Sequence, residues 1–350
     1  MNKKNAICAL ATGLSFLLLA SGCAREVSED GNAAAIRRFE SWLSIHHPDA
    51  VPVGSGIYIL SDTPGEGPVW DGETNSIAYM IETRKDLQGN ISSTNDEAVA
   101  KQIGSWSREG YYGPSIWYVT RGAMYEGLIE ALEVMDGIRE GGRRTVIIPS
   151  WLLTYKTYDT AEEYREHATG LSDMVIDIQL VSQADNVFDY QIRQLEDFTD
   201  RYLAGVDSTY YNNEDGSRYG FYYHQLRPAE TEEAMPSDTT VYINYTGRRL
   251  DGVVFDTTIA DTAKFYGIYS SSKTYQPVSV QWGSQYDAIT MTSSSTEPID
   301  GFQMALWRMR PGEKGITAFY SELGYGSSGS SSTIPSYAPL SFTIELVEKP

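Results

Sequence analysis

The sequence predicts an α+β protein in which one plan occurs twice: a curved antiparallel sheet wrapped around a short helix, with another helix in front. Two observations predict this class. Residues 174–180 and 340–346 alternate apolar and polar side chains, as strands do when one face covers a core. The glycine-led segment 141–150 parallels 312–321 without a gap. A sheet of this kind must cover its apolar face, and a short amphipathic helix can do so.

The first 22 residues are expected to be a lipoprotein signal peptide. Lys3 and Lys4 precede an apolar run over residues 6–20, which has the length of a signal-peptide core and is short for a membrane span. The run leads into LASGC, which resembles a bacterial lipobox and makes Cys23 the expected lipidation site. We therefore expect a lipid-anchored protein of the bacterial cell envelope, at the periplasmic face or the cell surface. An ordinary secretory signal is the alternative.

Cysteine content and charge narrow the possible chemistry. The chain has two cysteines, Cys8 inside the signal and Cys23, so no disulfide or thiol chemistry is expected after processing. The formal net charge of −20 argues against nucleic acid and anionic lipid surfaces as partners. Membrane attachment would therefore depend on the lipid.

The remaining chain divides into four expected segments. Residues 23–32 are a polar, acidic tether, and residues 33–183 form the first domain with its leading helix. Residues 184–219 are a helical linker, and residues 220–350 form the second domain.

Each domain begins with the same elements. Residues 33–46 and 186–203 are predicted to be helices because apolar side chains recur at helical spacing. Those side chains are Ile36, Phe39 and Leu43 in the first helix, and Ile192, Leu195, Phe198 and Tyr202 in the second. A strand that starts with glycine and aromatic residues follows each helix, at 56–59 and at 220–223.

The central helix of each domain also shows an apolar stripe. Its members are Leu128, Ala131, Met135 and Ile138 in the first domain, and Phe302, Ala305, Leu306 and Met309 in the second. The serine- and tyrosine-rich stretches 269–275 and 284–296 are predicted to be loops near the rim of a pocket.

Six short motifs follow one another in order between residues 241 and 348. They read YTG at 245–247, DGVVFD at 251–256, IDGF at 299–302, SELGYG at 321–326, IP at 334–335 and LSFTIEL at 340–346. Together they resemble the FKBP-type peptidyl-prolyl cis-trans isomerase domain. The first domain resembles a degenerate copy of it. The resemblance implies isomerisation of X-Pro bonds in proline-containing polypeptides, with no metal and no cofactor.

The resemblance also implies the residues of a pocket. Phe302 forms its floor; Tyr245, Phe255 and Phe342 are aromatic walls, Ile299 an aliphatic one, and Val278 stands where the family often has an aromatic residue. The hydroxyl of Tyr325 and the backbone amide of Ile334 are donors to substrate carbonyls. Asp256 lies at the rim, oriented by Tyr245. The catalytic set is thus Tyr245, Phe255, Asp256, Phe302 and Tyr325, and the substrate-binding set is Val278, Ile299, Ile334 and Phe342.

Such a pocket suits the chemistry of amide rotation. Rotation about an X-Pro bond breaks amide resonance, which gives a barrier of about 18–20 kcal/mol. The planar amide is more dipolar than the twisted one, so a dry aromatic pocket disfavours the planar form more. Stabilising the twisted state by about 5 kcal/mol would speed exchange several thousand-fold.

The first domain is not expected to be an enzyme. Ile81 or Glu82 replaces the pocket tyrosine, and NISST at 90–94 lacks the Phe-Asp pair. Ala131 falls where Phe302 lies. Thr154 falls where Tyr325 lies, although Tyr155 is only one residue away.

Two classes of function remain open. The first is a prolyl isomerase that acts on envelope or exported proteins through the second domain. The second is a non-catalytic binding, scaffold or chaperone lipoprotein with the same pocket. Other chemistry lacks support, because the adjacent His46 and His47 have no carboxylate or cysteine at ligand spacing and no hydrolase, nucleotide or redox motif occurs.

Overall fold

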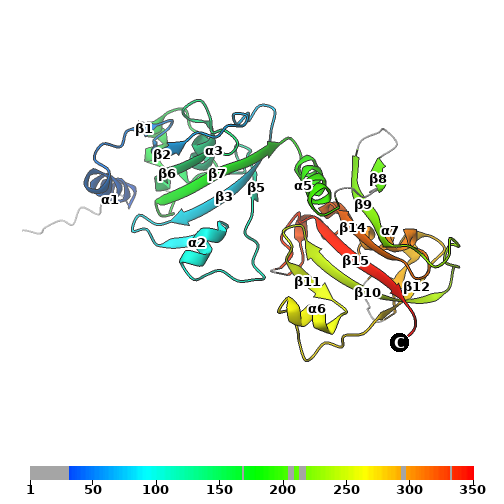
Figure 1. Ribbon diagram of the computed structural model, residues 1–350. Helices are drawn as coiled ribbons and strands as arrows, with labels where there is room; N and C mark the ends of the chain where they lie inside the picture. Colours follow the sequence, from blue (N-terminus) through cyan, green and yellow to red (C-terminus); the bar gives the residue numbers. More distant parts are fainter. Residues whose placement is uncertain (1–30, 168, 204–208, 213–217, 293–296, 332) are drawn as a thin grey trace, which may run out of the picture.

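The computed structural model describes residues 31–167, 169–203, 209–212, 218–292, 297–331 and 333–350 (Figure 1). The expected signal peptide, Cys23 and most of the expected tether lie outside these residues. Within them, no helix combines the length and the apolar character that a bilayer span requires.

The first half of the chain folds onto a seven-stranded sheet with the order β1-β2-β6-β7-β3-β4, in which β5 also pairs with β3. Neighbouring strands are antiparallel. The strands are β1 (Pro52–Val53), β2 (Ile57–Thr63), β3 (Ile77–Lys85), β4 (Ile91–Thr94), β5 (Ser115–Tyr118), β6 (Arg143–Ile148) and β7 (Met174–Ala184). The helices are α1 (Gly31–His46), α2 (Glu97–Gln102), α3 (Glu126–Glu133), η1 (Ser150–Leu152) and α4 (Ala161–Glu166).

The second half folds onto an eight-stranded antiparallel sheet with the order β13-β12-β10-β15-β14-β9-β8, in which β11 also pairs with β10. The strands are β8 (Thr209–Asn212), β9 (Arg218–Arg227), β10 (Thr240–Arg249), β11 (Val254–Thr257), β12 (Val278–Gln281), β13 (Thr290–Met291), β14 (Lys314–Phe319) and β15 (Leu340–Val347). The helices are α5 (Val187–Tyr202), α6 (Ala260–Phe265), η2 (Tyr286–Ala288), α7 (Asp300–Arg308), η3 (Ser321–Leu323) and η4 (Gly326–Ser328).

The two sheets repeat one topology, which confirms the predicted fold class. The strand order β9-β14-β15-β10 of the second sheet repeats β2-β6-β7-β3 of the first. α3 and α7 occupy the same place in the chain, directly before β6 and β14. A hydrogen bond between threonine hydroxyls recurs as well: Thr83 to Thr94 at 2.8 Å, and Thr246 to Thr257 at 2.9 Å.

Each sheet buries its concave face against its own helix. Phe39 of α1 and Leu128 and Leu132 of α3 join the first core, together with the inward side chains of the strands. Phe302 and Leu306 of α7 join the second core. Both sets consist of large apolar side chains taken out of water, which is the dominant stabilising term in folding.

Two expected boundaries differ from the structure. α1 begins at Gly31, inside the expected tether, and the buried side chain of Asn32 donates to the backbone carbonyl of Arg165. That contact ties the first turn to the domain. β8, and β9 from Arg218 onward, pair within the second sheet, so part of the expected linker 184–219 belongs to that sheet.

The predicted stripe of the first central helix is also wrong in its second half. α3 ends at Glu133, Met135 is 55% exposed with a φ of 56°, and Ile138 is buried outside the helix. Arg144 accounts for this early end, because its buried guanidinium donates to the backbone carbonyls of Ala131, Val134 and Gly137. Because these carbonyls already accept hydrogen bonds from Arg144, no further helical turn is required to satisfy them. In the second domain, Met309 lies one residue beyond α7, at its C-cap.

α5 lies between the two sheets in Figure 1 and contacts both. The side chain of Asn186 caps its first turn by accepting from the backbone N–H groups of Phe188 and Asp189. Leu195 and Phe198 are buried as predicted, but Tyr202 is 64% exposed and Gln191 is buried instead.

A second link between the domains is Arg249, at the end of β10. Its guanidinium donates to the carbonyls of Glu109 and Gly110 in the first domain and to that of Thr333 in the second. Asp251 neutralises its charge. All these partners lie around a side chain that is almost fully buried, so the first domain is fixed to the turn that follows β10.

We expect Arg144→Met to destabilise the first domain by about 3 kcal/mol, because three buried or partly buried carbonyls and Asp62 lose their donor. Hydrogen exchange read by mass spectrometry on the chain from residue 24 should show faster exchange in peptides of β6 and unchanged exchange in β14. Arg143→Met is the matched control, because that neighbouring side chain is 60% exposed. Equal protection in both variants would contradict this role.

Candidate active site

The register of β10 brings the predicted site residues together. Gly247 lies opposite Asp256 of β11 on one side and opposite Phe342 of β15 on the other. A Cβ atom on Gly247 would lie 2.6 Å from the ring of Phe342 and 2.7 Å from that of Phe255, so only glycine permits both rings to approach. The two rings meet edge to face with centroids 5.6 Å apart.

The floor and walls form one aromatic cluster. The ring of Phe302, from α7, lies 5.1 Å from that of Phe342 and 5.5 Å from that of Tyr245, both nearly perpendicular. Phe302 and Phe342 are buried, whereas Tyr245 and Phe255 are half-buried. The arrangement is a dry floor that opens toward solvent at Tyr245 and Phe255.

Asp256 is the polar centre of the rim. The hydroxyl of Tyr245 donates to one of its carboxylate oxygens at 2.6 Å. The ammonium of Lys273 and the backbone N–H of Thr257 donate to the other. The carboxylate is therefore held on both oxygens, as the predicted orientation by Tyr245 requires.

Both site tyrosines stay protonated. Burial, followed by the negative charge of Asp256, raises the pKa of Tyr245 well above its usual range. Burial and the same carboxylate also raise the pKa of Tyr325. Since each hydroxyl keeps its proton, each remains a hydrogen-bond donor, and the 37% exposed Tyr325 can offer its hydroxyl to a ligand.

The other predicted binding residues surround this centre with one difference in role. Val278 and Ile299 pack, half-buried, against the core, and Ile334 is buried within it. The backbone N–H of Ile334 donates to the carbonyl of Ser330 at 3.1 Å, so it is already paired and is not the free donor predicted.

Lys273 is the site residue that the motifs do not identify. It lies 17 residues after Asp256, in the predicted rim loop 269–275, and forms an ion pair with that carboxylate. The family resemblance leads us to expect a basic residue a few positions after the Phe-Asp pair, but residues 257–262 contain none. The signal available is only a single lysine in a serine- and tyrosine-rich stretch.

Among its described residues, the first domain does not repeat this aromatic cluster. The shared pairing to β7 and β15 places Glu82 where Tyr245 lies and Arg84 where Gly247 lies. Ser93 stands opposite Arg84, in the place of Asp256. An ion pair between Arg84 and Glu82, 3.1 Å apart, thus occupies the position that the second domain leaves to aromatic rings.

Tyr155 does not restore the missing tyrosine. Its ring is 51% exposed and stacks on Tyr125 with centroids 4.5 Å apart, and Thr154 accepts at its carbonyl from the N–H of Glu126. Ala131, in place of Phe302, is buried without a ring to form a floor.

The aromatic floor and the tyrosine–carboxylate rim bring apolar ring surface and hydrogen-bonding groups together in the second domain. Residues 231–347 match the family model of the FKBP-type peptidyl-prolyl cis-trans isomerases. The match covers most of the second domain and none of the first, so it is this domain that is similar to the FKBP-type family.

A curated protein is similar to this chain over part of its length. The macrophage infectivity potentiator of Trypanosoma cruzi is 28% identical over 128 residues, which are 37% of this chain and 52% of that protein. The chain therefore spans about half the length of this curated relative.

Three solved structures from other organisms are similar to parts of this chain. A peptidyl-prolyl cis-trans isomerase of Pseudomonas syringae pv. tomato is 24% identical, with 47% of this chain and 97% of that one covered and a TM-score of 0.29. The structure of the three FKBP domains of wheat FKBP73 is 17% identical, with 84% of this chain and 94% of that one covered and a TM-score of 0.29. The structure of FkpA from Escherichia coli is 23% identical, with 46% of this chain and 60% of that one covered and a TM-score of 0.30.

We expect Lys273→Met to lower kcat/KM for an X-Pro peptide by about two- to fivefold, since Asp256 loses the partner of one oxygen in a pair that is partly exposed. Lys273→Arg should restore most of the loss. Lys264→Met is the control, because that lysine pairs with Asp261 in the neighbouring helix. A Lys273→Met variant with unchanged kcat/KM would show that the ion pair is not part of the site.

Proposed function

We propose that the second domain catalyses cis-trans isomerisation of X-Pro bonds in envelope or exported polypeptides. The observation that carries the proposal is the aromatic cluster of Phe255, Phe302 and Phe342, bordered at its open rim by Tyr245 and Asp256. The proline ring would enter between the rings. The flanking amide would then leave water while its carbonyl and nitrogen face the rim.

Desolvation and polar contacts act in the same direction in such a pocket. The planar amide has the larger dipole and loses more when water is removed. The twisted amide has lost conjugation, so its carbonyl is less dipolar and its nitrogen is a better acceptor. In this proposal the hydroxyl of Tyr325 holds a substrate carbonyl, and Asp256 acts on the changing dipole. Tyr245 and Lys273 both bind the carboxylate of Asp256, which supports this role. No covalent bond needs to form or break.

We propose a non-catalytic role for the first domain. Arg84 and Glu82 fill the space that the second domain keeps for the substrate. Arg249 joins the first domain to the turn after β10 and to the carbonyl of Thr333, next to Ile334. The domain therefore supports and spaces the catalytic one.

We infer the cellular location of the protein from its sequence. A lipid on Cys23 would hold the protein at the bacterial envelope, and the substrates would then be polypeptides that fold there. If a lipid on Cys23 is the anchor, a chain that lacks residues 1–23 should be recovered in the soluble fraction.

The test of the activity is isomerisation of a short X-Pro peptide by the chain from residue 24. We expect catalysis that falls about tenfold to a hundredfold in Phe255→Ala, because an aromatic wall of the pocket is lost. Phe265→Ala is the matched control, since that ring is 78% exposed on α6. A folded chain without catalysis would assign the pocket to a binding or scaffold protein.

A further inference from the structure

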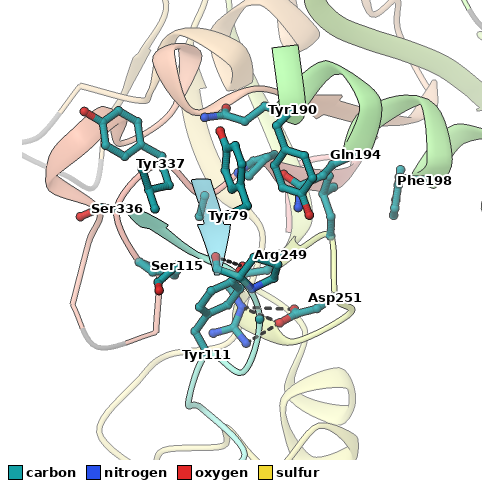
Figure 2. Close-up of a pocket in the computed structure, with 18 of the residues that line it drawn as sticks. Tyr79, Tyr111, Ser115, Tyr190, Gln194, Phe198, Arg249, Asp251, Ser336 and Tyr337 are labelled. Atoms are coloured by element: carbon teal, nitrogen blue, oxygen red, sulfur yellow. Dashed lines mark hydrogen bonds and ion pairs between the residues drawn. The ribbon is translucent and has the colours of Figure 1, made fainter. Parts of the chain in front are cut away.

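A cavity of about 930 Å³ lies between the two domains, on the side of the 333–339 loop that faces away from the pocket core. β3 and the segment before β5 form one wall, and α5 forms another. The turn at 249–251 and the loop at 335–339 complete it from the second domain. Figure 2 shows side chains from all of these elements converging on one space.

Tyrosine dominates the lining. The tyrosines that line the cavity are Tyr79, Tyr111, Tyr112, Tyr118, Tyr190, Tyr202 and Tyr337, and we name it the tyrosine cavity. The rings of Tyr79 and Tyr190 lie 3.9 Å apart, and those of Tyr118 and Tyr337 lie 6.3 Å apart. Tyr118 and Tyr202 are 46% and 64% exposed, so both have ring surface available to a ligand. Aromatic-lined grooves are the usual binding sites for proline-rich extended segments.

A buried donor in the lining has no partner. Gln191 is 1% exposed, and its side-chain oxygen accepts from the N–H of Ser321 at 2.7 Å. That contact sets the orientation of the amide, and its nitrogen has no hydrogen-bond partner among the described residues. An unpaired buried donor is costly. Because Gln191 lines the cavity, a small rotation of its side chain would let the enclosed nitrogen donate to an acceptor held there. Polyproline-type chains offer such acceptors, because their carbonyls make no internal hydrogen bonds.

The charges favour a neutral ligand. The guanidinium of Arg249 is taken up by Asp251 and by backbone carbonyls. Asp197 and Arg201 contribute one charge of each sign from neighbouring turns of α5. The positive and negative charges of the lining therefore balance, so a phosphate or another anion would gain little electrostatic attraction there. An uncharged peptide segment does not depend on such attraction.

We propose that the tyrosine cavity binds an extended, proline-containing segment of the same polypeptide whose X-Pro bond enters the isomerase pocket. This inference rests on the proposed function. The 333–339 loop joins the two places: Ile334 packs in the core beside Phe302, while Pro335, Ser336 and Tyr337 line the cavity. A long substrate held in the cavity is therefore kept close to the pocket.

The test uses a fluorescein-labelled oligoproline peptide and fluorescence anisotropy with the chain from residue 24. We expect Tyr118→Ala with Tyr202→Ala to weaken binding by about tenfold. Both rings are exposed, so the variant should fold, and Tyr155→Ala is the matched control because it is equally exposed and lies outside the lining. A Gly-Ser peptide of equal length should bind to neither form.

A second variant tests the unpaired donor. Gln191→Glu keeps the acceptor for the N–H of Ser321 and replaces the amide nitrogen by an oxygen, so at mildly alkaline pH it should weaken oligoproline binding as well. Binding that is unchanged in both the tyrosine variant and Gln191→Glu would overturn the proposal and leave the unpaired donor to water.

One further variant separates this inference from the proposed function. Oligoproline binding should persist in Phe255→Ala, because that ring is not part of the cavity lining. If binding is lost in Phe255→Ala, the peptide occupies the isomerase pocket and the cavity assignment fails. Turnover of a short X-Pro peptide by the unaltered chain is decided separately and bears only on the proposed function.

Discussion

The close approach of two phenylalanine rings over Gly247 is the constraint on which the pocket depends. β10 runs between β11 and β15, so Gly247 faces Asp256 on one strand and Phe342 on the other. Its missing side chain leaves room for Phe255 and Phe342 to meet, and Tyr245, two residues earlier on the same face, reaches the carboxylate. Any larger residue would displace the walls of the pocket.

The first domain shows what the same backbone does without that glycine. Arg84 occupies the equivalent position, pairs with Glu82 and faces Ser93. The sheet, the central helix and the threonine–threonine bond are retained, so the fold survives while the pocket does not. Packing of the sheet against its helix sets the architecture. A few positions on β3 and β4, or on β10 and β11, decide whether a ligand can enter.

Those parts that depend on local pattern could be predicted from the sequence. The duplicated plan and helix α5 follow from periodicity, and the contact of Tyr245 with Asp256 follows from the family resemblance of the ordered motifs. Parts that depend on contacts between distant segments could not. Lys273 reaches Asp256 across a loop, and Arg144 ends α3 from the following strand.

Burial in α5 illustrates the same limit. An apolar stripe predicts Tyr202 inside, yet Tyr202 is exposed and the polar Gln191 is buried. The reason is that α5 packs between two domains rather than on one, and the N–H of Ser321 in the second domain selects Gln191. Helical spacing along one segment contains no information about such a partner.

The most direct test of the account is an NMR titration of the ¹⁵N-labelled chain from residue 24 with a short X-Pro peptide. The account predicts that shifted amides gather around Phe255, Asp256 and Tyr325, and that those of Glu82, Arg84 and Ser93 do not move. Shifts centred on β3 and β4 of the first domain would contradict it, because a substrate would then bind where Arg84 and Glu82 fill the pocket.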